Sequence, residues 1–201
     1  MTFYHGSPIA NITELGTISY THDESKTSTV YLTPNRAYAL FYIRDLDINY
    51  VTCGVTEEGF IRYDERFSEQ LKKLYSDKSG YLYTCADDSN YEKTNTRDVW
   101  VSKEPVKIIS AEFISDVYKE LQKYIESGVI RVARYETLSE TEKEDIYNMT
   151  VWSLYRSGLT EKDTPKARFY CENFSGAWCF VKAHPELKQQ TLDEWDLNHK
   201  G

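Results

Sequence analysis

The hydrophobic positions of the first 115 residues fall in short runs, a pattern that predicts strands with one or two helices between them. The stretches TFYHG and TVYLT are typical of strands, the first ended by Gly-Ser-Pro and the second by Pro34. Thr33 is a candidate N-cap, and the apolar positions in PNRAYALFYIRDL follow a helical period. We therefore predict a strand, a turn and then a helix from Pro34 to Asp45.

Several further elements are expected before residue 115. NYVTCGV and GFIRYDE predict a hairpin, because Gly59 between them can take the positive φ of a tight turn. RFSEQLKKLY predicts a short amphipathic helix, GYLYTCA a strand and DDSNYEKTNTRD a polar loop. VWVSKEPVKIISAEFI predicts two extended pieces that are broken at Glu104-Pro105.

From Ser115 onward the pattern becomes helical. DVYKELQKYIES has a helical period, and Ser139 with Glu142 forms a capping-box pattern before IYNMTVWSLYRSG. A third helical stretch begins at TPKARFY, and we expect these helices to bury Trp152, Phe169 and Trp178.

The order of elements predicts an α+β protein in two parts. Residues 1–115 are expected to form a core with a split mixed β-sheet, in which TFYHG and TVYLT are neighbouring central strands. Residues 116–201 are expected to form a helical extension that packs on this core.

Charge and cysteine content narrow the classes of function. A formal net charge of −8 and the lack of a basic run argue against binding to nucleic acid. The four cysteines form no CxxC pair, which favours reduced thiols in a cytoplasm. No stretch approaches the roughly 18 apolar residues that a membrane helix needs, and the N-terminus lacks an export signal pattern. We therefore expect a cytoplasmic protein with neither nucleic acid nor membrane as a partner.

Tyrosine is unusually frequent, with 17 residues against 8 phenylalanines. A tyrosine offers a flat apolar ring with a polar tip, which suits a pocket for a flat polar ligand. Aromatic residues are also common on half-exposed faces of sheets, so the count alone leaves both interpretations open.

The segments YHGS and VYLTPNRAYALFY resemble the first two signature blocks of ADP-ribosyltransferases of the poly-ADP-ribose-polymerase and diphtheria-toxin branch. In that branch one strand carries His-Gly-Ser or His-Gly-Thr, a second strand carries a tyrosine, and the following helix supplies another. Tyr31 and Tyr42 are eleven residues apart, as are the two tyrosines of the polymerase motif. The resemblance covers residues 3 to 44 and, as an order of strands, extends to about residue 115.

The resemblance implies that NAD is bound as a substrate. His5 would bind a ribose hydroxyl, and the backbone of Gly6 would pair with the nicotinamide carboxamide. Tyr31 and Tyr42 would enclose the nicotinamide ring. Two further residues are candidates for the same site: Ser7 as a second hydrogen-bond partner, and Tyr38, one helical turn before Tyr42, as an alternative ring wall.

The third block of the family, a glutamate on a late strand, has no clear counterpart. Asp98, Glu104 and Glu92 are the candidate carboxylates near the strand VWVSKEPVKI. Asp98 is closer to the position where the family's glutamate enters its strand but is one methylene shorter, whereas Glu104 is held extended by Pro105. His22, in the loop before the second strand, is a further candidate.

Two functions are consistent with these residues. The first is an NAD-binding ADP-ribosyltransferase-like enzyme that transfers ADP-ribose, with a protein as a possible target, or hydrolyses NAD. The alternative is an inactive module of the same fold that binds a small-molecule nucleotide or a protein partner, because residues 85–110 contain no Glu-x-Glu or Gln-x-Glu. An RNA phosphotransferase of related fold is disfavoured, since it would need several basic residues around a phosphate.

Overall fold

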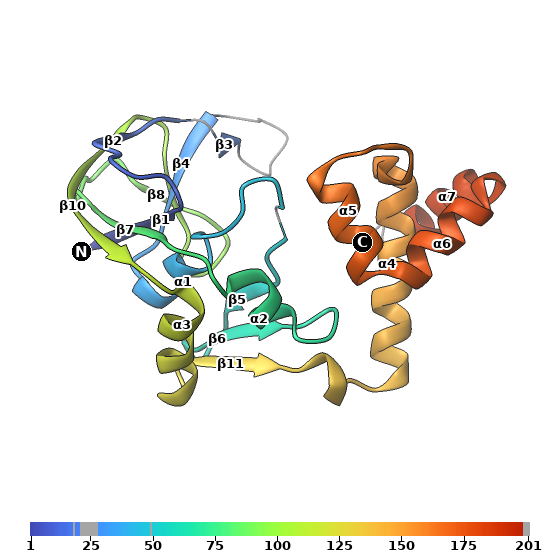
Figure 1. Cartoon of the computed structure of the whole chain (residues 1–201). Helices are drawn as coiled ribbons and strands as arrows, with labels where there is room; N and C mark the ends of the chain where they lie inside the picture. The colour runs from blue at the N-terminus through green and yellow to red at the C-terminus, as the bar shows by residue number, and fades with distance from the viewer. Residues whose placement is uncertain (18, 21–27, 49, 199–201) are drawn as a thin grey trace. The chain divides into compact units, whose positions relative to one another are not determined.

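The computed structural model describes residues 1–17, 19–20, 28–48 and 50–198 and has an α+β fold with three sheets and a helical C-terminal region (Figure 1). The chain divides into two compact units. The first unit comprises residues 1–45, 51–65 and 70–133, and the second, which we call the helical unit, comprises residues 46–50, 66–69 and 134–201. The α+β class and the helical C-terminal region are confirmed.

The first sheet holds the strand with the histidine. Its order is β1 (Phe3–Ser7), β7 (Gly80–Cys85), β10 (Val106–Ile114) and β2 (Glu14–Leu15), with antiparallel neighbours throughout. His5 lies opposite Tyr83 in the ladder of β1 and β7. This pairing occupies one edge of β1 along its whole length.

Two further sheets complete the first unit. One has the order β3 (Ser19–Tyr20), β4 (Ser28–Leu32), β9 (Trp100–Ser102) and β8 (Glu92–Lys93). The other joins β5 (Cys53–Val55) and β6 (Ile61–Asp64) in the predicted hairpin, with Gly59 at a φ of 91°. The strand β11 (Ile130–Ala133) adds to β6 in parallel, which makes this sheet mixed.

The predicted single sheet for TFYHG and TVYLT is wrong, because β1 and β4 belong to different sheets. They touch at one bridge, in which Tyr4 and Thr33 exchange both backbone hydrogen bonds at 2.7 and 3.1 Å. The reason is that β4 pairs with β9 and β1 pairs with β7, so each strand has a full ladder elsewhere. The edge of β1 beyond Tyr4 is therefore left without a strand in the described part of the chain.

The helix after β4 is shorter than predicted. Helix α1 spans Arg36–Leu40, and its N-cap is Asn35 rather than Thr33. Thr33 cannot cap the helix because its backbone is used in the bridge to β1, and its hydroxyl accepts from the Asn35 N–H at 3.0 Å. After Leu40 the chain continues in tighter turns, with the Tyr42 N–H donating to the Ala39 carbonyl at 3.1 Å.

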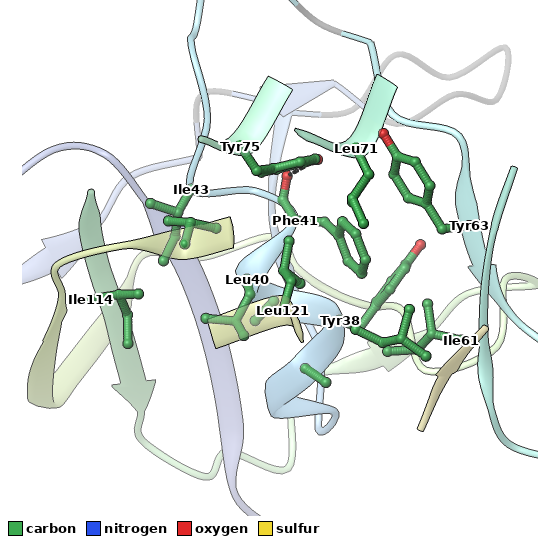
Figure 2. Packing of buried hydrophobic residues seen from close by; sticks show 14 of the residues in the cluster. Tyr38, Leu40, Phe41, Ile43, Ile61, Tyr63, Leu71, Tyr75, Ile114 and Leu121 are labelled. Atoms are coloured by element: carbon green, nitrogen blue, oxygen red, sulfur yellow. Dashed lines mark hydrogen bonds between the residues drawn. The ribbon is translucent and has the colours of Figure 1, made fainter. Parts of the chain in front are cut away.

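The core of the first unit forms around α1. Helices α2 (Gln70–Tyr75) and α3 (Val117–Glu126) pack with it and with the third sheet (Figure 2). The buried residues of this core include Leu40, Phe41, Ile43, Ile61, Tyr63, Leu71, Tyr75 and Leu121. Tertiary packing of these side chains explains why the end of α1 departs from the regular helix that its sequence period predicts.

The helical unit contains helices α4 (Glu140–Ser157), α5 (Pro165–Asn173), α6 (Ser175–Ala183) and α7 (Lys188–Asn198) (Figure 1). Short 3₁₀ turns lie at Tyr135–Thr137, Leu159–Glu161 and Pro185–Leu187. The capping box of Ser139 and Glu142 at the start of α4 is confirmed. None of the helices in the described residues is long and apolar enough to cross a membrane.

The region after residue 115 differs from the expected helices in two details. Residues 116–133 lie in the first compact unit and include the strand β11. Phe169 is buried as expected, but Trp152 and Trp178 are only half-buried. Trp152 instead stacks on Trp195, with ring centroids 4.9 Å apart.

Candidate functional site

The imidazole of His5 is fixed by the backbone of the second sheet. Its Nδ1 lies 3.0 Å from the carbonyl oxygen of Tyr31 on β4. A carbonyl can only accept, so Nδ1 carries the proton and Nε2 of the neutral ring remains an acceptor. Burial lowers the pKa of His5 below its ordinary value, and the hydrogen bond to Tyr31 opposes this only in part. The neutral ring is therefore the form present near pH 7.

Gly6 lies against α1 on one face of β1, and its backbone N–H and C=O point to an edge of the same strand. A Cβ at this position would lie 2.0 Å from the Ala39 carbonyl oxygen of α1, so the close approach of this helix to β1 requires glycine. Along the strand, the N–H and C=O of alternate residues point to the same edge. Because Tyr4 pairs with Thr33, those of Gly6 point to the edge beyond that bridge, where they have no partner in the described part of the chain.

Ser7 has a local structural contact. Its side chain is buried, and its Oγ accepts a hydrogen bond from the Ile9 N–H at 3.2 Å in the turn that follows β1. The hydroxyl thus stabilises the turn, and its role as a ligand partner stays a prediction.

The tyrosines of α1 differ in burial. Tyr38 is 4% exposed and lies within the core shown in Figure 2, whereas Tyr42 is half-buried. Their rings meet edge to face with centroids 5.8 Å apart, and their hydroxyls are hydrogen-bonded to each other. Burial raises the pKa of both hydroxyls. Of the two rings, that of Tyr42 is therefore the more accessible.

Tyr31 comes from β4, where it lies opposite Val101 of β9, and its side chain is half-buried. Its electrostatic effect raises the pKa of Tyr42, which indicates that the two tyrosines lie near each other. The predicted enclosure of a ring between them stays a prediction.

Asp98 lies close to the start of α1. Its Oδ2 accepts a hydrogen bond from Nδ2 of Asn35 at 3.3 Å, and its charge contributes to the raised pKa of Tyr38. The residue has a φ of 56°, in the left-handed region that aspartate tolerates better than most residues. Of the predicted carboxylates, Asp98 is therefore the one with contacts to α1.

Glu104 and Glu92 have other surroundings. Glu104 is exposed and follows the opposite end of β9, where its backbone N–H donates to the Ser102 hydroxyl at 3.2 Å. Glu92 is also exposed and forms an ion pair with Lys103 at 2.7 Å. Neither carboxylate is brought to α1, and His22 lies outside the described residues.

A separate pocket of about 220 Å³ lies in the helical unit, between the end of α4, α6 and the start of α7. None of the predicted site residues lines this pocket. Among the described residues, no group of histidine, cysteine, aspartate or glutamate side chains has the arrangement of a metal site.

Asn35 is the residue near the site that the sequence interpretation missed. Its side chain caps α1 by accepting from the Tyr38 N–H at 3.2 Å and also contacts Asp98. Asparagine is among the preferred N-caps, so its place directly before RAYAL was a usable signal that the Thr33-Pro34 pattern obscured.

Comparison with protein-family models, with curated proteins and with solved structures finds no match for this chain. Any assignment of function consequently depends on the residues of the first unit themselves.

Proposed function

We propose that the first unit is an ADP-ribosyltransferase-like domain that binds NAD and breaks its bond between ribose and nicotinamide. One observation carries this proposal: a fixed, neutral His5 is followed directly by Gly6, whose backbone N–H and C=O have no partner in the described residues. Both residues lie beside the bridge between β1 and β4. The split between these two strands is the feature that we equate with the split sheet of that family. Residues of the helical unit have no part in the proposed site.

The nicotinamide half of NAD matches the edge of β1 chemically. Its carboxamide has one acceptor and an NH₂ donor, which complement the N–H and C=O of Gly6. The half-buried ring of Tyr42 provides a flat wall for the pyridine ring. Nε2 of His5 can accept a hydrogen bond from a ribose hydroxyl, because Nδ1 is committed to the Tyr31 carbonyl.

Asp98 is the proposed catalytic carboxylate of the reaction. When the glycosidic bond breaks, nicotinamide leaves with the bonding electron pair and positive charge develops on the ribose. A nearby carboxylate stabilises that charge more in the transition state than in the bound substrate. Water or a nucleophile of a target protein then attacks the ribose carbon and loses a proton, which completes hydrolysis or transfer of ADP-ribose.

The alternative is a module that binds a nucleotide without turnover. The observation in its favour is that the acid is an aspartate, one methylene shorter than the family's glutamate, and that its Oδ2 is already hydrogen-bonded to Asn35. Such a carboxylate has a shorter reach toward a bound ribose.

Titration calorimetry with NAD and with ADP-ribose tests the binding site. We expect His5→Ala to weaken binding by about tenfold or more, since a lost hydrogen bond costs about 1–3 kcal/mol. Tyr42→Ala should have a similar effect because it removes a stacking wall. The matched control is His184→Ala, a histidine of the helical unit with an exposed side chain. Absence of binding at millimolar NAD to the wild-type protein would reject the proposal.

Release of nicotinamide separates the enzyme from the binding module. We expect Asp98→Asn to bind NAD with nearly wild-type affinity and to release nicotinamide at least tenfold more slowly, an effect of about 1.4 kcal/mol on the barrier. Glu104→Gln is the matched control and should behave as the wild type. Binding of NAD without release by the wild-type protein would favour the inactive module.

A further inference from the structure

Asn35 joins the helix that carries the tyrosines to the loop that carries the acid. Its Oδ1 accepts from the Tyr38 N–H at 3.2 Å, and its Nδ2 donates to Oδ2 of Asp98 at 3.3 Å. Its own N–H donates to the Thr33 hydroxyl at 3.0 Å, beside the bridge to β1. One amide side chain thus connects the start of α1, the end of β4 and the entry to β9.

The oxygen and the nitrogen of the Asn35 amide make different contacts. The carbonyl end satisfies one of the N–H groups that the first turn of a helix leaves without a partner. The NH₂ end is a donor, which an aspartate or a serine in the same place could not supply in the same geometry. Capping of α1 and contact with Asp98 can therefore be separated by substitution.

In the loop around Asp98, local hydrogen bonds hold the backbone, and the hydrogen bond from Asn35 orients the carboxylate. The Val99 N–H donates to the Thr96 carbonyl at 3.1 Å, and the Thr94 N–H donates to the Val99 carbonyl at 3.0 Å, so the backbone turn is closed on both sides. These bonds close the turn that carries Asp98, and the hydrogen bond to Asn35 ties this turn to the start of α1. Within the described residues, the Asp98 side chain accepts a hydrogen bond from Asn35 at Oδ2, and Oδ1 has no hydrogen-bond partner.

We propose that Asn35 is a positioning residue that holds the Asp98 carboxylate, with one oxygen bound and the other directed to a ligand, without itself contacting NAD. This inference rests on the proposed function. A neutral donor fixes the rotation of the carboxylate and leaves its negative charge in place. Loss of this hydrogen bond lets the carboxylate turn away from the reacting ribose, and small displacements of an acting group reduce a rate strongly.

Two variants keep the cap and remove the donor. Asn35→Ser and Asn35→Asp both place an N-cap acceptor before α1, so the melting temperature should remain close to that of the wild type. We expect kcat for nicotinamide release to fall on the order of tenfold in Asn35→Ser, as for a lost hydrogen bond to a charged group. The fall should be larger in Asn35→Asp, because its carboxylate also repels that of Asp98. The KM for NAD should stay within about twofold, because the residues proposed to bind NAD are unchanged.

The matched control is Asp116→Ser at the N-cap of α3, whose Oδ1 accepts from the Lys119 N–H at 3.0 Å. This change also exchanges one capping side chain for another, and kcat should be unaffected. A purely structural role of Asn35 would instead predict equal behaviour of the Asn35 and Asp116 variants. Wild-type kcat in Asn35→Ser, or a rise in KM without a fall in kcat, would overturn the inference.

Hydrogen exchange provides a readout that does not need NAD. The Val99 amide, next to Asp98, should exchange several-fold faster in Asn35→Ser than in the wild type and at the wild-type rate in Asp116→Ser. Unchanged exchange in Asn35→Ser would overturn the positioning role even in a protein without NAD activity. Failure of the wild-type protein to bind NAD, with faster exchange in Asn35→Ser, would reject the proposed function and retain the link between Asn35 and Asp98.

Discussion

The two units use aromatic side chains in different ways. The first-unit cluster contains Tyr38, Tyr42, Tyr63 and Tyr75, whose hydroxyls have specific partners. The cluster of the helical unit contains Tyr50, Phe67, Phe169, Tyr170 and Phe174, whose ring centroids lie 5.4 to 6.4 Å apart. In the first cluster hydrogen bonds and ring contacts occur together at each of these tyrosines, whereas the second has many ring contacts and a hydrogen bond between the Tyr170 hydroxyl and Ser153.

This difference explains part of the tyrosine excess. In the first unit, Nε2 of Gln70 donates to the Tyr63 hydroxyl at 2.9 Å. The Tyr75 hydroxyl donates to the Phe41 carbonyl at 3.0 Å (Figure 2). Burial raises the pKa of these hydroxyls above the ordinary value for tyrosine, so they stay protonated to a higher pH than an exposed tyrosine does. Tyrosine therefore serves in the first unit to combine a packed core with polar contacts beneath α1. In the helical unit, three of the five rings of the cluster are phenylalanines, which pack without a polar contact of the side chain.

The largest expected effect tests how closely α1 lies on β1 in the first unit. Gly6→Ala would place a methyl group 2.0 Å from the Ala39 carbonyl oxygen, a backbone atom that cannot move without shifting α1. We expect a loss of about 4 kcal/mol or more in the free energy of unfolding, measured by urea denaturation. The matched control is Gly54→Ala in β5, where a Cβ meets nothing within 4 Å. Equal stability of the two variants would contradict the close contact.

The helical unit was the more predictable of the two from sequence. Its signals are local: the capping box of Ser139 and Glu142, and Thr164 with Pro165 at the start of α5, act within one turn of a helix. The first unit depends on pairings between distant segments, such as β11 with β6, and no local pattern specifies them. This is why residues 130–133 were expected to be part of a helical region.

For the candidate site, the sequence names candidate residues but does not specify how they are arranged. The motif YHGS identified His5 and Gly6, but the contact of His5 with the Tyr31 carbonyl and that of Gly6 with α1 depend on how two sheets meet. The sequence leaves both Asp98 and Glu104 as candidate carboxylates, because both flank β9. In the structure they lie at opposite ends of this strand, and Asp98 is the one that contacts Asn35.

A smaller loss of stability is expected from the cluster of the helical unit. Phe174 is 9% exposed and contacts four of its aromatic neighbours, so Phe174→Ala should reduce the free energy of unfolding by about 3 kcal/mol. Phe113→Ala in β10 is the matched control, because this ring is 58% exposed and its removal leaves no cavity. Chemical denaturation of both variants measures the difference, and a comparable loss in the two would show that the ring cluster adds little.

The next effect isolates a hydroxyl in the first-unit cluster. Tyr75→Phe keeps the ring and removes the donor to the Phe41 carbonyl, so the buried carbonyl loses this partner. We expect a loss of about 1 kcal/mol in the free energy of unfolding. Tyr147→Phe, on an exposed side chain of α4, should change stability much less. A stabilising effect of Tyr75→Phe would indicate that ring packing dominates in the first unit as well.

The smallest effect extends the comparison to His5, a polar group of the first unit that titrates near neutral pH. Burial lowers the pKa of His5 from the value of 6.5 that it has in an unfolded chain. As the pH falls through 6.5, the unfolded chain therefore takes up a proton before the folded protein does. Folding stability is lost in this range, because it falls with pH wherever the unfolded state binds more protons.

His5→Asn removes this titration while retaining a side chain that can donate to the Tyr31 carbonyl. The carboxylates that also titrate on acidification remain in both proteins, so their contribution cancels in the difference. We expect the melting temperature of the wild type to fall more than that of His5→Asn between pH 7.5 and pH 5, and the two curves to run parallel above pH 7.5. Curves that stay parallel throughout would mean that the imidazole is hydrated, in which case its hydrogen bond to β4 does not hold it away from water.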